Sequence, residues 1–263
     1  MSKKTAAILT SLLAISVLFF LLKEWVASHL FDPLLPAYIQ LAYPSFNPVN
    51  GKLGGKEVII PSHFANYIEY DKQNESSKKK QIKSFGFFVR YPDMSGLSTE
   101  ELVAEKNKQT INNTMWIDVG ISSGTIYPGN GFLDRRASYI NSPEHKNSEQ
   151  SGSKFKFERS NELFHDLIVY KPLGVNIENR VPFKTDGDDI DFFINRNNKN
   201  EVTTYIECSN VLIESAPCIH YFSLEPNMEV KVYVGYRRGM LPEWKKIQFN
   251  LTHLIGSWVI QNQ

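Results

Sequence analysis

The stretch YIECSNVLIESAPCIHYFSLE, Tyr205–Glu225, contains both cysteines of the 263-residue chain, Cys208 and Cys218. Each cysteine borders a short run of aromatic and β-branched residues, which is the pattern of two strands joined by a turn. Neighbouring antiparallel strands bring such residues within reach of each other. Whether the two cysteines form a disulfide, a metal site or a catalytic thiol depends on the compartment in which this segment lies.

The N-terminal segment predicts that compartment. Residues 5–22 contain no charged side chain, and about 18 residues are the shortest helix that crosses a bilayer. The run is longer than the apolar core of a signal peptide, and no small-residue cleavage site follows it directly. Lys3 and Lys4 precede the run and Lys23 follows it, a bias that places the N-terminus in the cytoplasm. We therefore expect a retained single-pass anchor with the remaining chain beyond the membrane; a cleaved signal peptide is the alternative.

Beyond the membrane, a disulfide is the simplest use of two cysteines. A thiolate metal site needs three or four ligands, and His220, two residues after Cys218, fits no common zinc spacing. A catalytic thiol stays an alternative, because its base can come from a distant part of the sequence. We predict the disulfide Cys208–Cys218.

The chain divides into an anchor, a tether and one domain. Residues 1–24 hold the cytoplasmic tip and the transmembrane segment. Residues 25–55 are interrupted by four prolines, which exclude a continuous helix, and we interpret them as a proline-rich tether. Residues 56–263 are expected to form one extracytoplasmic, β-rich domain.

Short runs of β-branched and aromatic residues, bounded by Gly, Pro, Asn or Asp, dominate that domain and predict strands joined by hairpins. One of them, Leu163–Lys171, would place His165 and Asp166 on opposite faces of a single strand. The predicted strands are Lys56–Pro61, Lys83–Pro92, Thr114–Ser122, Ser153–Ser160, Leu163–Lys171, Ile190–Asn195, Glu201–Cys208, Cys218–Phe222 and Met228–Arg238.

Two helices are predicted among these strands. Ser98 lies three residues before Glu101, which is a capping box at the start of a surface helix. Near the C-terminus, an apolar stripe follows Pro242 at spacings of three and four residues, and such a stripe packs on a sheet. Its members are Trp244, Ile247, Leu251, Leu254 and Trp258. The predicted fold is α+β and β-rich: a mainly antiparallel sheet with a C-terminal amphipathic helix packed on it, after one N-terminal transmembrane helix.

Composition excludes several functions. The chain has 29 basic and 28 acidic residues, so it lacks the basic excess that binds nucleic acid. It has no zinc-protease helix, phosphate-binding loop or dinucleotide-binding glycine pattern. We expect no nucleic-acid partner, no cofactor and no catalytic histidine.

Four aspartates cluster within six residues: Asp186, Asp188, Asp189 and Asp191. Such a cluster can bind calcium or form the D-x-D motif of a metal-dependent glycosyltransferase. The calcium-loop spacing is missing, and no buried parallel strand leads into the segment. A solvated turn around Gly187 is therefore favoured, with an acidic patch that contacts a basic partner as an intermediate interpretation.

The segment 192–258 resembles the C-terminal part of the immunity proteins of type VI secretion systems, which are membrane-anchored proteins of the Gram-negative periplasm. The resemblance rests on three features: a strand that ends in IECS, a second cysteine before a histidine and an aromatic residue, and the strand VKVYVGYRR that leads into LPEWKKI. It implies a non-enzymatic domain that binds and occludes a cognate effector in the periplasm. Residues 5–22 would hold this domain at the inner membrane.

The resemblance does not select a contact surface, so polar loops on a rigid scaffold are the natural candidates. These loops are residues 71–81, 127–136 and 185–191. The expected partner-binding residues are Asp186, Asp188, Asp189, Asp191, Arg135 and Arg136. Two other functions stay open, a membrane-anchored glycosyltransferase-like enzyme that uses the aspartates with a divalent metal, and a structural component of an envelope complex.

Overall fold

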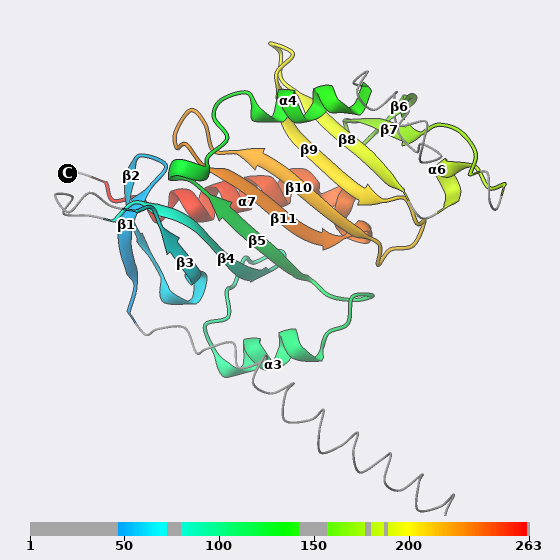
Figure 1. Cartoon of the computed structure of the whole chain (residues 1–263). Helices are drawn as coiled ribbons and strands as arrows, with labels where there is room; N and C mark the ends of the chain where they lie inside the picture. The colour runs from blue at the N-terminus through cyan, green and yellow to red at the C-terminus, as the bar shows by residue number, and fades with distance from the viewer. Residues whose placement is uncertain (1–46, 73–79, 142–156, 177–179, 187–188, 262–263) are drawn as a thin grey trace, which may run out of the picture. The chain divides into compact units, whose positions relative to one another are not determined.

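Nine antiparallel strands form one sheet that organises the part of the chain described by this computed structural model (Figure 1). The described residues are 47–72, 80–141, 157–176, 180–186 and 189–261. In spatial order the strands are β3 (Asn66–Tyr70), β4 (Ile82–Arg90), β5 (Trp116–Ser122), β11 (Lys231–Arg237), β10 (Pro217–Ser223), β9 (Val202–Ser209), β8 (Ile190–Arg196), β7 (Leu167–Pro172) and β6 (Phe157–Phe164). The predicted antiparallel, β-rich fold is confirmed.

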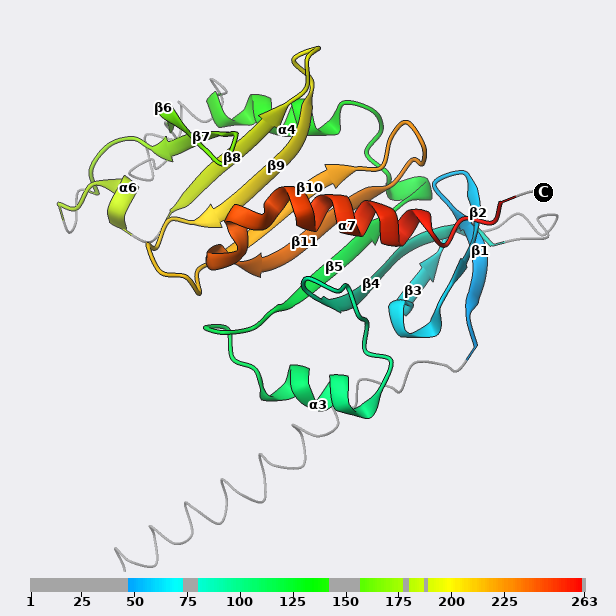
Figure 2. The same ribbon diagram turned by 180° about the vertical axis from the view of Figure 1, so that it is seen from behind.

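One helix, α7 (Trp244–Gly256), lies along one face of this sheet, which we call the back face (Figure 2). It follows the 3-10 segment η5 (Arg238–Glu243), which contains Pro242. The predicted apolar stripe is confirmed in this helix, with one change. Ile255 is fully buried and Leu254 only partly, because Ile255 lies four residues after Leu251 on the same side of the helix.

The opposite face, which we call the front face, is covered in one half by α4 (Phe132–Ser138) (Figure 1). Phe132, Leu133 and Ala137 are buried there in a second apolar cluster, together with residues of β8 and β9. The sequence pattern did not predict this helix, because seven residues are too few to show an apolar period. Over the other half of the front face, formed by β3, β4, β5 and β11, no helix lies among the described residues (Figure 1).

A two-stranded hairpin, β1 (Val49–Leu53) and β2 (Lys56–Ile60), lies outside the main sheet. Its turn consists of Gly54 and Gly55, with φ values of 53° and 84°, a backbone conformation that glycine adopts without strain. Ile59 also donates a backbone hydrogen bond to Trp258, and Ile260 donates one to Glu57. The assignment of residues 49–53 to the tether is therefore wrong, because they pair with β2.

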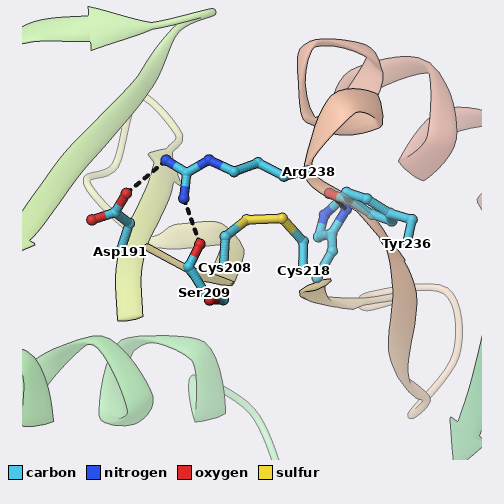
Figure 3. Close-up of a disulfide and its surroundings, with 7 residues drawn as sticks. Asp191, Cys208, Ser209, Cys218, Tyr236 and Arg238 are labelled. Carbon is cyan, nitrogen blue, oxygen red and sulfur yellow. Dashed lines mark hydrogen bonds and ion pairs between the residues drawn. A yellow bond between two sulfur atoms is a disulfide. The ribbon is translucent and has the colours of Figure 1, made fainter. Parts of the chain in front are cut away.

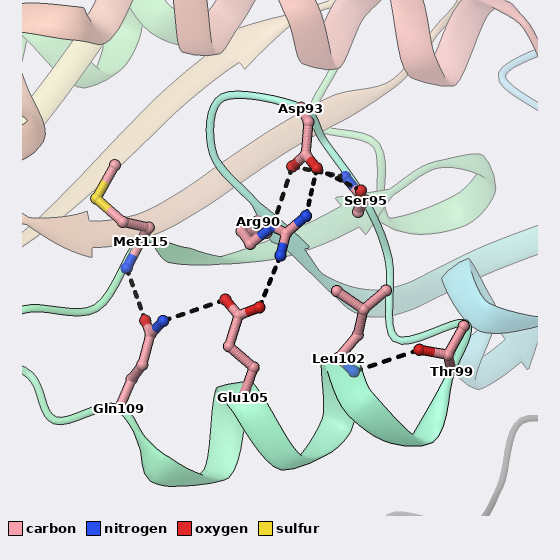
Figure 4. A network of polar contacts seen from close by, with 8 residues as sticks. All are labelled: Arg90, Asp93, Ser95, Thr99, Leu102, Glu105, Gln109 and Met115. Atoms are coloured by element: carbon pink, nitrogen blue, oxygen red, sulfur yellow. Dashed lines mark hydrogen bonds and ion pairs between the residues drawn. The ribbon is translucent and has the colours of Figure 1, made fainter.

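The helix α3 (Glu100–Lys108), between β4 and β5, is held by polar contacts (Figure 4). Arg90 donates 2.6 Å hydrogen bonds to Glu105 of this helix and to Asp93. The N-cap is Thr99, whose hydroxyl accepts a hydrogen bond from the amide of Leu102 at 3.3 Å. The helix therefore begins one residue after the position that the predicted cap at Ser98 implied. None of the residues of α3 is fully buried.

The predicted strand 163–171 is instead a hairpin, because β6 ends at Phe164 and β7 begins at Leu167. His165 and Asp166 form its turn with φ values of 48° and 67°, so they do not lie on opposite faces of one strand. Both are in the left-handed region that a two-residue hairpin turn requires. The short helical segments are η1 (Ser62–Phe64), η2 (Gly124–Ile126), η3 (Tyr139–Asn141) and α6 (Phe183–Asp186).

None of the helices within the described ranges is both long and apolar enough to cross a membrane. The predicted anchor, residues 5–22, and most of the predicted tether lie outside those ranges.

Candidate partner-binding surface

The predicted disulfide is present. Cys208 of β9 and Cys218 of β10 are direct cross-strand partners, with Cα atoms 4.0 Å apart and their sulfur atoms bonded (Figure 3). Both are buried. Because these are the only two cysteines of the chain, neither supplies a metal ligand or a thiol nucleophile. The bond closes the base of the turn between β9 and β10, where Leu212 and Ile213 are exposed.

Asp191 is a structural residue beside this disulfide. Its side chain is only 1% exposed, and Arg238 donates to its carboxylate at 2.6 Å (Figure 3). The same guanidinium donates to the carbonyl oxygen of Ser209 at 2.6 Å. A carboxylate buried in an ion pair is not accessible to a docked partner. Asp191 is therefore not a contact residue, contrary to the expectation from the sequence.

The rest of the aspartate cluster is only partly described. Asp188 lies outside the described residues, and Asp186 is described only by its backbone, as the last residue of α6. Asp189 is half-buried. Its backbone amide donates to the side-chain oxygen of Asn210 at 3.2 Å, and its carbonyl oxygen accepts from the backbone amide of Asn210 at 2.9 Å. Across the described residues, no three His, Cys, Asp or Glu side chains are grouped as metal ligands.

The two predicted arginines of α4 have different surroundings. Arg135 is folded back on the preceding loop, where it donates to the carbonyl oxygens of Pro128 and Asn130 at 2.5 Å and 2.7 Å. Arg136 lies on the front face above Tyr205 and Tyr221. Its guanidinium carbon is 5.2 Å and 4.1 Å from the centres of the two rings, distances at which a cation is attracted by an aromatic face.

Glu207 completes the cluster around Arg136, since it accepts a hydrogen bond of 2.8 Å from the guanidinium. Burial opposes the charge on Arg136, but the attraction and hydrogen bond of Glu207 raise its pKa above the usual value. Burial also raises the pKa of Tyr205 and Tyr221. The arginine is thus a fixed cation between neutral rings and one carboxylate, and we call Arg136, Tyr205, Glu207 and Tyr221 the Arg136 cluster.

The structure brings two predicted contact residues, Arg136 and Asp189, to one pocket of about 310 Å³ at the edge of α4. Tyr205, Glu207 and Phe192 also line it. Arg135 lies outside this lining. Of the predicted contact segments, 127–136 forms the loop before α4 and most of that helix, whereas 71–81 and 185–191 fall partly outside the described residues.

Three tyrosines that the sequence reasoning missed form a row across the front face. Tyr205 of β9 is the direct partner of Tyr221 in β10, which is the direct partner of Tyr233 in β11. Direct partners on neighbouring strands point to the same face. The row leads from beneath α4 to the open half of the sheet. Alternation within each strand was visible in the sequence, but the pairing of the strands was not.

These features define a class of protein: a β-rich domain with one face closed by a helix and the other presenting aromatic side chains and an ordered arginine. Tyrosine and arginine are the side chains most enriched where protein interfaces gain their binding energy. The front face therefore carries residue types that are common in protein interfaces.

Comparisons with known proteins identify a solved structure with a similar fold. The chain is similar to the solved structure of Smlt3025, an immunity protein of the Stenotrophomonas maltophilia type IV secretion system, with a TM-score of 0.52 and 17% sequence identity. The similarity covers 82% of this chain and 94% of that one, and at this identity it shows a shared fold. No protein-family model matches the chain, and no curated protein matches its sequence.

Proposed function

We propose that this protein is an immunity protein that binds a cognate antibacterial effector and occludes its active surface. The observation that carries the proposal is the fold shared with Smlt3025 over 82% of the chain. The resemblance of residues 192–258 supports the same function and favours an effector of a type VI system. Occlusion depends on the face presented to the effector and not on its delivery route, so the proposal holds for either type of system.

The proposed binding surface is the front face, centred on the Arg136 cluster. Arg136 is already held by Glu207 and two tyrosine rings, so less conformational freedom is lost when a partner docks on it. A stable complex buries about 800 Å² on each partner, an area that would extend from α4 along the tyrosine row. We propose that this happens in the periplasm, with residues 5–22 as an inner-membrane anchor.

The test combines protection and binding. The product of the neighbouring open reading frame is directed to the periplasm of a sensitive strain, with or without the full-length protein, and the complex is isolated through a tag on the protein. We expect survival and a complex of one effector per protein. Arg136→Ala should weaken binding by about tenfold or more, as for a central interface arginine.

Lys246→Ala is the matched control, because Lys246 is an exposed cation on α7 behind the sheet. It should leave binding unchanged. Toxicity that persists with wild-type protein present, together with no complex, would overturn the immunity function. Equal binding by Arg136→Ala and wild type would remove the Arg136 cluster from the interface.

A further inference from the structure

The open half of the front face contains a groove of about 390 Å³. We call it the Asp118 groove and define it by Tyr67 of β3, Gly86 and Phe88 of β4, Asp118 of β5 and Tyr233 of β11, all of which line it. The groove continues the tyrosine row, because Tyr233 is its last member. It therefore adjoins the surface assigned above to the effector.

Glycines form the floor at this end of the sheet. Gly86 and Gly120 are direct partners on β4 and β5, and Gly120 is the direct partner of Tyr233. A methyl group at Gly120 would lie 1.9 Å from the Tyr233 ring, so the ring rests against bare backbone. Paired glycines inside strands mark a place where another group approaches the backbone closely.

Tyr67 has an unusual backbone. Its φ is 53°, in the left-handed region that bulky residues rarely occupy. The strand pairing shifts register between Asn66 and Glu69, and such a bulge redirects a side chain. The side chain is 82% exposed, so no burial within the described structure compensates this conformation. A strained and exposed aromatic residue on a groove points to a role in binding.

Asp118 is the one charged side chain among the described residues that line the groove. The described counter-charge that acts on it is Lys106 of α3, whose Nζ lies 3.9 Å from the centre of the Phe88 ring. No ion pair of Asp118 within 4.0 Å is found in the described part of the chain. Burial raises the pKa of Asp118 and lowers the pKa of Lys106. The charge of each group shifts the pKa of the other in the opposite direction, but by less than burial does. The carboxylate is therefore incompletely neutralised.

We propose that the Asp118 groove binds one lysine or arginine side chain of the effector, with its cationic group at Asp118 and its stem against Tyr67 and Tyr233. This inference rests on the proposed immunity function and names the chemistry of its partner. A carboxylate and aromatic rings both attract a cation, and Gly86, which has no side chain, leaves room for the effector backbone beside it. In the free protein, Lys106 lies beside Phe88 and competes for the same carboxylate.

The competition gives two substitutions with opposite expected effects on binding. Asp118→Asn keeps the shape of the side chain and removes its charge, and we expect it to weaken effector binding by about tenfold. Lys106→Ala removes the competing cation, and we expect it to strengthen binding several-fold. Glu158→Gln, at an exposed acid on the edge strand β6, is the control and should leave affinity unchanged.

Affinities are measured with full-length protein in detergent and an inactivated effector. Each lysine and arginine of the effector is then replaced by alanine and tested against both wild type and Asp118→Asn. One replacement should weaken binding to wild type and have little further effect on Asp118→Asn, which is the coupling expected of a contact pair.

The outcomes separate the two proposals. Wild-type binding that Asp118→Asn leaves unchanged would overturn the groove assignment and leave the immunity function standing. If the wild-type protein neither binds the effector nor protects against it, the immunity function falls and the groove assignment falls with it. Weaker binding of Lys106→Ala would also contradict the groove assignment, because it would make Lys106 a contact and not a competitor.

Discussion

Arg238 donates a 2.6 Å hydrogen bond to the buried carboxylate of Asp191. Asp191 lies in β8, and Arg238 is the first residue after β11, where η5 leads into α7. The second hydrogen bond of Arg238, to Ser209 at the end of β9, extends the link to a third strand. One residue thus links the segment that leads into the back-face helix with three strands of the sheet.

Asp191→Ala should be strongly destabilising. The substitution leaves the largely buried guanidinium of Arg238 without its counter-ion, and breaking such a pair from one side costs about 3 kcal/mol of unfolding free energy. Denaturant unfolding measures the change. Lys245→Ala is the control, since Lys245 on α7 pairs with Asp166 on the surface, and an exposed pair contributes little. Equal effects of the two substitutions would contradict the structural role of Asp191.

Reduction of Cys208–Cys218 should lower stability without abolishing the fold. The bond closes a short loop, with a sequence separation of 10, and the chain-entropy estimate for such a loop is about 3 kcal/mol. Urea unfolding with and without reductant should show this difference. The double variant Cys208→Ala with Cys218→Ala should be insensitive to reductant. A wild-type unfolding curve that reductant does not move would contradict the prediction.

His220 should make the protein less stable in acid. Its ring is buried and bonds Gln248 at 3.1 Å through Nε2, and burial lowers its pKa from 6.5 to about 3. Below pH 6.5 the imidazole of His220 is protonated in the unfolded chain, whereas in the folded protein it stays neutral down to about pH 3. Stability is therefore lost as the pH falls through this window, by up to about 1.4 kcal/mol per pH unit.

The measurement compares the pH dependence of urea unfolding in wild type and His220→Gln. Carboxylates contribute to both curves and cancel in the difference. The variant should lose less stability than wild type on acidification across this window. Parallel curves would show that His220 does not resist protonation in the folded protein.

Gly120→Ala should destabilise the protein or displace Tyr233, because the new methyl group would lie 1.9 Å from that ring. Overpacking of this kind costs about 1–3 kcal/mol. Gly86→Ala is the control, since its methyl group would meet nothing closer than 3.4 Å. In a Tyr233→Ala background, Gly120→Ala should become mild. A cost that persists in that background would show that the ring is not the obstacle.

The anchor at residues 5–22 is a prediction from sequence. The full-length protein should remain in the membrane pellet after alkaline carbonate extraction, because an apolar run of this length holds a chain in the bilayer. Exchange of residues 5–22 for an unrelated anchor should preserve protection against the effector. Release of an N-terminally shortened protein into the periplasmic fraction would instead indicate a cleaved signal peptide.

Many of the strands and the back-face helix were readable from the sequence because their signals are local. Alternating or β-branched runs predicted β4, β5, β8, β9 and β10 to within a few residues. The apolar stripe of α7 repeats over several turns, so the period was visible. The pairing of Cys208 with Cys218 was also accessible, because a hairpin places the ends of two consecutive strands side by side.

Tertiary contacts decided the rest. β11 lies between β5 and β10, although more than a hundred residues separate it from β5, and only that order aligns Tyr233 with Gly120. The sequence pattern predicted Asp191 to be one of four solvated acids. In the structure it is buried in an ion pair with Arg238, which comes from the end of another strand. Sequence alone determined most of the central strands and the helix that covers them, since those depend on neighbours along the chain. The binding face was decided by register and strand order, because these are set by contacts between distant segments that no local pattern records.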